Sequence, residues 1–191
     1  LKEEPTADNV RFYLAWVLEE AKELNLALTE FKKVKSDSTL FKESSIHIGF
    51  ILKEQKKFDE GLKFSKKLID SNAKEEEYFD MHASFLEAKR EFAKSLQVVE
   101  NALVMFPKSE KLTYFKGVLQ EKNGNLAGAI ATMKGLVSIN PNNYHALNFV
   151  AYLYAESGEN LEEAESLVKK AMSLKPNDGF IEDTLGWVRL K

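Results

Sequence analysis

At 191 residues, 44% of them apolar, the chain can bury a substantial core as one domain or two small ones. It holds no cysteine, which excludes a disulfide framework, a thiolate metal site and a cysteine nucleophile. The net charge of −3 comes from 27 basic and 30 acidic residues that are well interspersed, so the sequence predicts no contact with a nucleic acid or an anionic membrane.

The chain starts at Leu1, without an initiator methionine and without a basic and apolar leader. We therefore expect it to be a fragment of a longer protein, and its compartment stays open. No apolar run approaches the ~20 residues that a membrane-spanning helix requires.

Small residues recur along the whole chain with one period. A first series has steps of 34, 34, 34, 34 and 35 residues: Ala15, Gly49, Ala83, Gly117, Ala151 and Gly186. A second series has steps of 34, 34, 34 and 35: Ala27, Gly61, Ser95, Ala129 and Ala164. The longer last step places a one-residue insertion between Gly158 and Leu161. A fixed period of this length indicates a repeat architecture.

Within each period the apolar residues keep helical spacing, with a short polar break between two halves. Each unit is therefore predicted to be a helix, a tight turn and a second helix, and strand signals are almost absent. Small residues fit this interpretation because two helices approach closely only where one backbone carries a small side chain. In chain order the expected repeats are 8–41, 42–75, 76–109, 110–143 and 144–178, followed by a partial repeat, 179–191.

Local signals mark the ends of the predicted helices. The last three complete boundaries pair a proline with an N-cap residue two positions later: Pro107 with Ser109, Pro141 with Asn143, and Pro176 with Asp178. Glycines in "NGN" at 123–125 and "SGEN" at 157–160 are predicted to form the turns inside two repeats.

A 34-residue helix-turn-helix unit with the pattern W-x2-L-G-x2-Y, A-x3-F and P resembles the tetratricopeptide repeat. The best match is "LNFVAYLYAESGENLEEAESLVKKAMSLKP", which places these residues on the pattern: Leu147, Val150, Ala151, Tyr154, Ala164, Val168 and Pro176. The sequence departs from this pattern at four positions: Thr39 and Ala73 replace terminal prolines, and His82 and Lys116 replace leucines. The resemblance covers nearly the whole chain and implies a single all-α array, an α-solenoid that forms a right-handed superhelix.

The closing segment "GFIEDTLGWVRLK" resembles the first helix of a sixth repeat without its second helix. We expect a truncated array in preference to a natural cap, and a lone helix that packs on the second helix of repeat five. The segment also resembles bacterial tetratricopeptide proteins, some of them envelope lipoproteins. This favours the bacterial cell envelope over the cytoplasm as the compartment.

No chemistry-bearing motif stands out. His47, His82 and His145 occupy different repeat positions, so none pairs with another as a metal ligand along one helix. No nucleophile elbow, phosphate-binding glycine loop or H-E-x-x-H occurs. The sequence therefore predicts no enzyme, no metal and no cofactor.

Lysines concentrate on the expected second helices: Lys32, Lys33 and Lys35; Lys63, Lys66 and Lys67; Lys169 and Lys170. RNA-reading pentatricopeptide arrays have a similar period, but neighbouring acids here cancel the positive field that phosphate binding needs. We interpret these lysines as a solvated convex surface and expect no nucleic-acid partner.

The resemblance implies that positions 2, 5, 9, 12 and 13 of each repeat line a concave groove. None of the pairs at positions 5 and 9 supplies the lysine and asparagine clamp of the chaperone-binding branch. The predicted binding groove comprises Phe12, Trp16, Ile46, Phe50, Asp80, Glu87, Tyr114, Val118, Glu121, Asn148 and Tyr152. Asp80 and Ser84 give it a polar waist, and Asp183 and Trp187 extend it. The alternative is that Phe12, Ile46 and Phe50 merely pack between adjacent first helices.

The expected groove positions hold ten acids and four bases: Glu19, Glu20, Glu43, Glu54, Glu77, Asp80, Glu87, Glu121, Glu156 and Asp183 against Lys53, Lys111, Lys122 and Lys191. Together with the aromatic residues they predict a protein scaffold for a peptide or helical segment with apolar and basic residues. The alternative function is a structural module that self-associates through exposed repeat ends.

Overall fold

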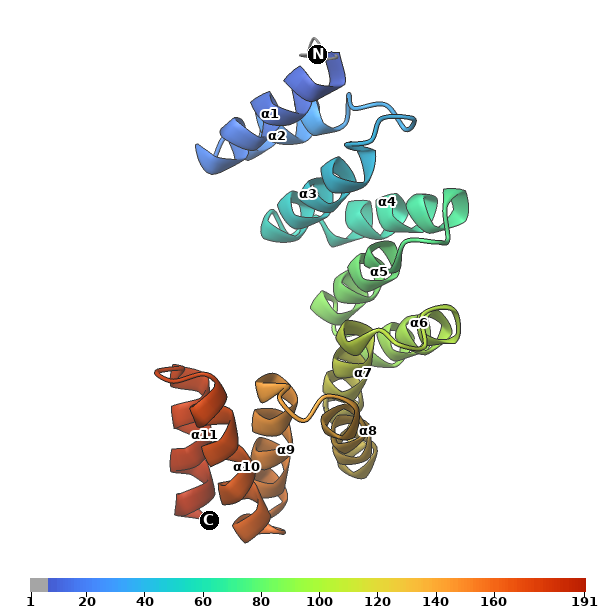
Figure 1. The fold of residues 1–191 in the computed structure, drawn as a ribbon. Helices are drawn as coiled ribbons and strands as arrows, with labels where there is room; N and C mark the ends of the chain where they lie inside the picture. The colour runs from blue at the N-terminus through green and yellow to red at the C-terminus, as the bar shows by residue number, and fades with distance from the viewer. Residues whose placement is uncertain (1–6) are drawn as a thin grey trace. The chain divides into compact units, whose positions relative to one another are not determined.

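The computed structural model describes residues 7–191, which form eleven α-helices and no strand (Figure 1). The odd-numbered helices are α1 (Ala7–Glu20), α3 (Phe41–Glu54), α5 (Glu76–Ala88), α7 (Glu110–Lys122), α9 (Tyr144–Ser157) and α11 (Gly179–Leu190). The even-numbered helices are α2 (Leu24–Phe31), α4 (Phe58–Ser71), α6 (Phe92–Met105), α8 (Leu126–Ile139) and α10 (Leu161–Leu174). The predicted all-α fold of helix pairs is confirmed, whereas the right-handed superhelix stays a prediction. Within the described range, none of these helices is both long enough and apolar enough to cross a membrane.

The chain divides into two compact units after Glu91. The division falls inside the expected third repeat, since α5 packs against α3 and α4 while α6 packs against α7. Each unit has an apolar core of its own, with Phe31 and Phe85 fully buried in the first and Met133 and Leu147 in the second.

The small-residue series lie where helices approach most closely, as predicted. All members of both series up to Ala164 are buried. A Cβ placed on Gly49 would lie 2.6 Å from Met81 Cε, and one on Gly117 would lie 2.6 Å from Met133 Cε. Gly186 differs, because a Cβ there would meet no atom within 4 Å.

Every turn inside a helix pair has the same hydrogen-bonded form. Each first helix from α1 to α9 is followed, one or two residues after its end, by a residue of positive φ: Lys22, Lys56, Arg90, Gly124 and Gly158. In each case two crossed backbone hydrogen bonds close the helix, as from Lys56 N to Lys53 O and from Lys57 N to Leu52 O. This is the Schellman motif, which satisfies the last carbonyl groups of a helix.

The one-residue insertion predicted between Gly158 and Leu161 is found in the turn between α9 and α10. Here a second residue, Asn160, also adopts a positive φ of 52°. The other four turns of this kind contain one such residue each. The turn therefore absorbs the additional residue and leaves Ala151 and Ala164 buried.

The three predicted N-caps are confirmed. Ser109 Oγ accepts from Leu112 N at 3.2 Å, Asn143 Oδ1 from Ala146 N at 3.0 Å, and Asp178 Oδ1 from Phe180 N at 3.1 Å. Each side chain thus satisfies one of the unpaired N–H groups at a helix start.

Helix α2 is shorter than the sequence period implies. It has 8 residues, whereas the other four second helices have 14 each. The prediction that Lys32, Lys33 and Lys35 lie on a second helix is therefore wrong, because they follow the end of α2 at Phe31. The Ser36–Thr39 stretch has low helix propensity, and bonds such as Val34 N to Phe31 O continue the chain as turns.

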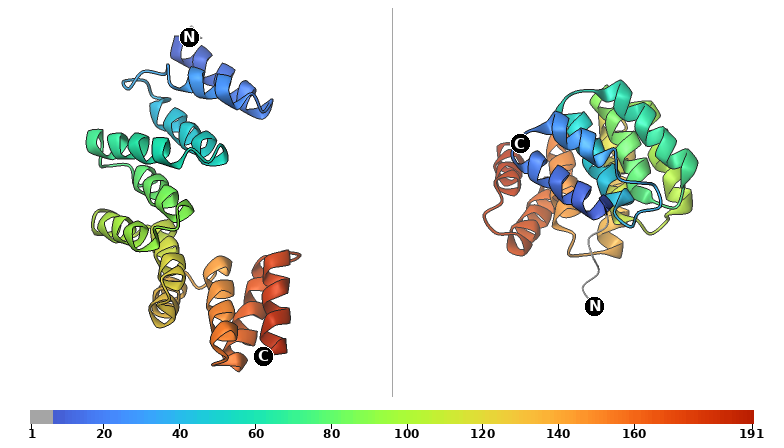
Figure 2. Two further views of the ribbon diagram at one scale, coloured as in Figure 1. Left: turned by 180° about the vertical axis from the view of Figure 1, so that it is seen from behind. Right: turned by 90° about the horizontal axis from the view of Figure 1, so that it is seen from above.

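Helix α11 packs against α10, as expected, and also against α9; Figure 2 shows the three side by side. Ile181, Thr184 and Val188 are buried in these contacts, and Arg189 Nε lies 3.2 Å from Glu165 Oε1. Only some of the apolar side chains of this helix face outward, since Leu190 is 75% exposed and Val188 is not.

Candidate functional site

Helices α7 and α9 bring five ring side chains together in the second unit, which we call the aromatic face: Tyr114, Tyr144, His145, Phe149 and Tyr152. The Tyr114 ring centre lies 5.7 Å from that of Phe149 and 6.1 Å from that of His145. Phe149 lies 6.0 Å from Tyr152, and Tyr144 lies 4.1 Å from His145. One continuous set of rings therefore joins the two first helices.

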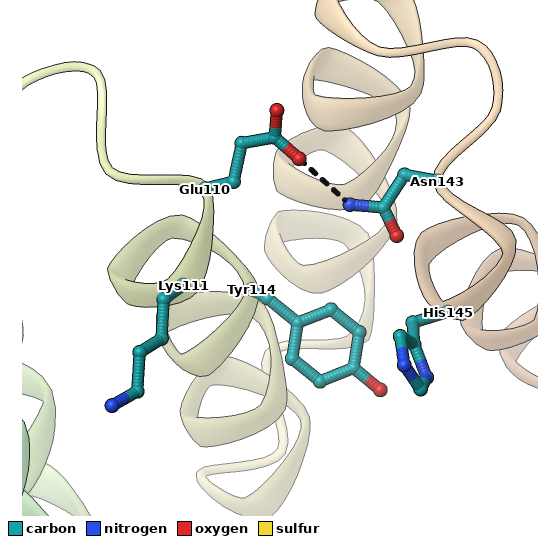
Figure 3. A pocket seen from close by; sticks show the side chains of 5 residues that line it. All are labelled: Glu110, Lys111, Tyr114, Asn143 and His145. Atoms are coloured by element: carbon teal, nitrogen blue, oxygen red, sulfur yellow. Dashed lines mark hydrogen bonds between the residues drawn. The ribbon is translucent and has the colours of Figure 1, made fainter.

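A cavity of about 290 Å³ opens beside this face, lined by Glu110, Lys111, Tyr114, Asn143 and His145 (Figure 3). The Tyr114 hydroxyl points toward His145 across the cavity, whereas the Lys111 side chain extends away from His145. Asn143 Nδ2 donates to Glu110 Oε2 at 3.1 Å. This bond links the start of α7 to the N-cap of α9.

Burial and nearby carboxylates change the pKa values of Tyr114 and Tyr152. Burial raises the pKa of Tyr114. Burial also raises the pKa of Tyr152, and the negative charges of Glu156 and Glu121 add to the effect. Tyr152 therefore lies in a negative field that two carboxylates from α9 and α7 produce, and this field attracts a cation.

The predicted residues of the second unit lie on or near the aromatic face. Tyr114, Val118 and Tyr152 are half-buried, with their remaining surface open to solvent. Asn148 is half-buried too, and its Oδ1 is buried without a hydrogen-bond partner. Glu121 lies on α7 and acts on Tyr152 through its charge.

The predicted residues of the first unit divide into core and surface. Phe12 is 6% exposed, and its ring centre lies 5.7 Å from Phe31 and 5.8 Å from His47. Phe12 and the half-buried Ile46 thus pack between helices, which was the alternative raised for them.

Trp16 and Phe50 remain on the surface, with 46% and 63% of their area exposed. Phe50 therefore does not pack between helices, contrary to the alternative. Asp80 and Glu87 are half-buried on α5.

Several acids that were expected to face a ligand are paired within the protein instead. Glu19 Oε2 lies 2.6 Å from His47 Nδ1, and Glu54 Oε1 lies 3.5 Å from Lys22 Nζ. Hydrogen bonds from Lys42 to two carboxylates, one of them Glu77 at 2.8 Å, raise the pKa of that lysine. The excess of acids over bases is therefore a weaker guide to the ligand than the sequence suggested.

The histidines have partners within their own units. His82 Nδ1 lies 2.8 Å from Ser65 Oγ, and His47 stacks on Phe31 with ring centres 4.8 Å apart. Residues 7–191 contain no group of three acidic or histidine side chains placed to hold a metal ion.

The predicted binding groove did not include His145. The repeat period could have identified this residue, because it shares a repeat position with Lys111. His145 is the second residue of its expected repeat and Lys111 is the second residue of the preceding one. Both line the cavity.

Comparison with known proteins agrees with this architecture. No protein-family model matches the chain. The TPR repeat-containing protein PA4667 of Pseudomonas aeruginosa is 26% identical over 188 residues, which cover 96% of this chain. The chain spans 31% of that relative's length.

Solved structures of low sequence identity share the fold. A TPR protein of Thermus thermophilus, TTC0263, aligns with a TM-score of 0.75 at 17% identity, over 97% of this chain and all of that one. A tetratricopeptide repeat protein of Parabacteroides merdae gives 0.77 at 18% identity, over 96% and 72% of the two chains. YrrB, described as a TPR protein with an unusual peptide-binding site, gives 0.64 at 16% identity, over 91% and 89%.

Paired helices, periodic small residues and identical turns define an α-helical repeat protein. The predicted resemblance is confirmed: the chain resembles a tetratricopeptide repeat-containing protein in sequence and shares the fold of solved tetratricopeptide-repeat structures. The fold is in general a protein-interaction module, and proteins of this kind are generally scaffolds without catalysis.

Proposed function

We propose that the aromatic face on α7 and α9 binds an apolar peptide or helical segment that carries a basic residue. The observation that supports this most directly is the arrangement of Tyr114 beside a cavity of about 290 Å³. Half-buried aromatic side chains are frequent interface anchors, since they bury a large area with little loss of rotamer freedom. A partner's aliphatic or aromatic side chain would occupy the cavity.

The basic residue of the partner is inferred from the surroundings of Tyr152. Glu121 and Glu156 both act on this tyrosine through their charges. A lysine or arginine placed over the ring would gain from both carboxylates and from the ring face itself. YrrB, which shares the fold, carries a peptide-binding site, and this likeness favours a peptide over a small molecule here.

The first unit contributes candidates of the same kind. Trp16 and Phe50 are exposed aromatic residues on first helices, and Asp80 and Glu87 lie on the first helix α5. We propose them as contacts for a partner segment on the first unit.

Selection from a phage-displayed random peptide library tests the proposal with the chain as it stands. We expect enriched peptides to combine aliphatic or aromatic residues with lysine or arginine, and to lose binding to the Tyr114→Ala variant. Tyr13→Ala is the matched control, since Tyr13 is 58% exposed and lies on α1, outside the aromatic face. Enrichment of acidic peptides, or equal loss with Tyr13→Ala, would contradict the assignment.

Self-association is a second candidate function, and one observation favours it. Val10, Leu14 and Val17 form an i, i+4, i+7 stripe on α1, and each is about half exposed. Such a stripe can cover an equivalent stripe on a second copy. Sedimentation velocity over a hundredfold concentration range distinguishes the two: a constant monomer mass would exclude self-association.

A further inference from the structure

The early end of α2 opens a cavity of about 510 Å³ in the first unit, away from the aromatic face. Its walls are mostly apolar and come from α2, α3 and α4, with Phe31, Ile48, Phe64 and Leu68 among them. This volume lies within the range of small-ligand pockets, which are concave, mainly apolar and carry a few polar groups.

Ser44 lines this cavity with a hydroxyl that has no hydrogen-bond partner, although its Oγ is buried. A serine inside a helix can donate to the carbonyl four residues earlier. Ser45, the next residue, does so, with its Oγ 2.8 Å from Phe41 O. A buried polar group without a partner is unfavourable unless a ligand or water satisfies it.

The same cavity carries positive charge. Lys32 and Lys67 both line it. Lys32 Nζ is engaged with Glu60 Oε1 at 2.8 Å. Lys67 makes no ion pair within residues 7–191, whereas its neighbour Lys66 pairs with Asp70 at 3.1 Å. The cavity therefore combines apolar walls, one unsatisfied hydroxyl donor and one available cation.

We propose that this cavity binds an aliphatic carboxylate, such as a medium-chain fatty acid. The hydrocarbon chain lies against the half-buried Phe41 and Phe64, above the buried Phe31, Ile48 and Leu68, which removes apolar surface of the ligand and of the two phenylalanines from water. The carboxylate accepts a hydrogen bond from Ser44 Oγ and pairs with Lys67 Nζ. This site is independent of the proposed peptide function, since none of its lining residues is among the proposed peptide contacts.

Calorimetric titration of the whole chain with hexanoate, octanoate and decanoate, below their micellar concentrations, tests the apolar part of the proposal. Each added methylene of the ligand should strengthen binding about fourfold, which corresponds to about 0.8 kcal/mol per group. This increase should continue as long as the added methylenes still contact the apolar wall of the cavity. Amide chemical-shift changes should fall on residues 31–48 and 64–71. No saturable binding at any chain length, or shifts confined to other helices, would overturn the proposal.

Replacing the head group tests the polar part on the unmodified protein. Octanol should bind more weakly than octanoate, because it accepts from Ser44 but does not pair with Lys67. Octylammonium should bind more weakly than octanol, because its charge repels Lys67. If octylammonium bound as tightly as octanoate, the assigned head-group contacts would be wrong.

Two variant pairs assign the contacts. Ser44→Ala should weaken octanoate about three- to tenfold, as loss of one hydrogen bond does, and should raise the melting temperature of the free protein. Ser45→Ala is its control and should leave the affinity within twofold, because that hydroxyl is already bonded. Lys67→Gln should weaken octanoate about two- to fivefold at low salt and leave octanol unchanged, whereas Lys66→Gln should change neither. Equal effects within either pair would refute the assigned contact.

Discussion

Gly61 of α4 lies directly against the ring of Phe85 in α5, so a Cβ placed on Gly61 would be 2.3 Å from Phe85 Cζ. Phe85 is fully buried, and its ring has no free space into which it can withdraw. The second series of small residues is therefore a steric requirement at this position, where a first helix packs on the preceding second helix.

Gly61→Ala should lower the free energy of unfolding by about 1–2 kcal/mol, because overpacking outweighs the higher helix propensity of alanine. Gly135→Ala is the matched control. Gly135 lies inside α8, and a Cβ there meets no atom within 4 Å. The control should gain about 0.5–1 kcal/mol from propensity alone. Urea denaturation measures both, and a stabilised Gly61→Ala would show that the ring can move aside.

Lys56→Gly should stabilise the chain, by about 0.5–1 kcal/mol, because Lys56 occupies the left-handed region with φ of 56° and glycine adopts it without strain. The reciprocal control is Gly124→Ala in the equivalent turn, where φ is 78°. That change should destabilise by a similar amount. Thermal melting of the two variants should therefore shift in opposite directions, and shifts of the same sign would contradict the equivalence of the turns.

The first unit should lose stability as the pH falls below about 6.5, the ordinary pKa of histidine. Burial lowers the pKa of His82 in the folded chain, and the charge of Lys66 acts in the same direction, while a bond to the Leu62 backbone and the charge of Asp70 oppose them. Between the folded and unfolded pKa values the unfolded chain binds the proton and the folded chain does not. Protonation therefore favours unfolding.

His82→Gln removes this titration, so its unfolding free energy should depend less on pH between 7.5 and 5.5 than that of the parent chain. Urea midpoints at the two pH values measure the difference. His145→Gln is a control, since His145 is exposed on α9. An unchanged pH dependence in His82→Gln would show that other groups control the acid response.

For a peptide selected on the aromatic face, Tyr114→Ala or Tyr152→Ala should weaken binding by roughly 1–4 kcal/mol, as loss of interface anchors does. Glu121→Gln should matter less and act chiefly on the association rate at low salt. Surface plasmon resonance at two salt concentrations separates these effects. Binding that survived both tyrosine changes would place the peptide elsewhere on the chain.

Much of the fold could be predicted because the repeat period fixes which side chains meet. The N-caps Ser109, Asn143 and Asp178 and the turn glycines Gly124 and Gly158 act through local backbone geometry, which sequence reveals directly. The end of α2 at Phe31 could not be predicted in this way. Val34 keeps the apolar spacing and is buried, yet the chain around it leaves the helix. Periodicity indicates which side of the chain is buried but not whether the backbone remains helical.

The sequence predicted which helix face carries the candidate site, but not how far each side chain on that face is buried or paired. The same repeat position gives the half-buried Tyr114 and the buried Phe12, because Phe31 and His47 cover Phe12. Pairs such as Glu19 with His47 join residues 28 apart, and only the angle between packed helices decides whether they touch. The cavity beside Tyr114 likewise depends on the relative placement of α7 and α9, which the sequence does not contain.

The additional left-handed residue at Asn160 shows where this chain can change length. One residue inserted within a helix would rotate everything beyond it by about 100° and turn a buried glycine or alanine toward solvent. The same residue inserted in a turn leaves both flanking helices in register, as Ala151 and Ala164 demonstrate. Natural insertions and engineered tags should therefore be tolerated at the positive-φ turns after Lys22, Lys56, Arg90 and Gly124. Those four turns are suitable sites for spectroscopic labels that leave the helix contacts intact.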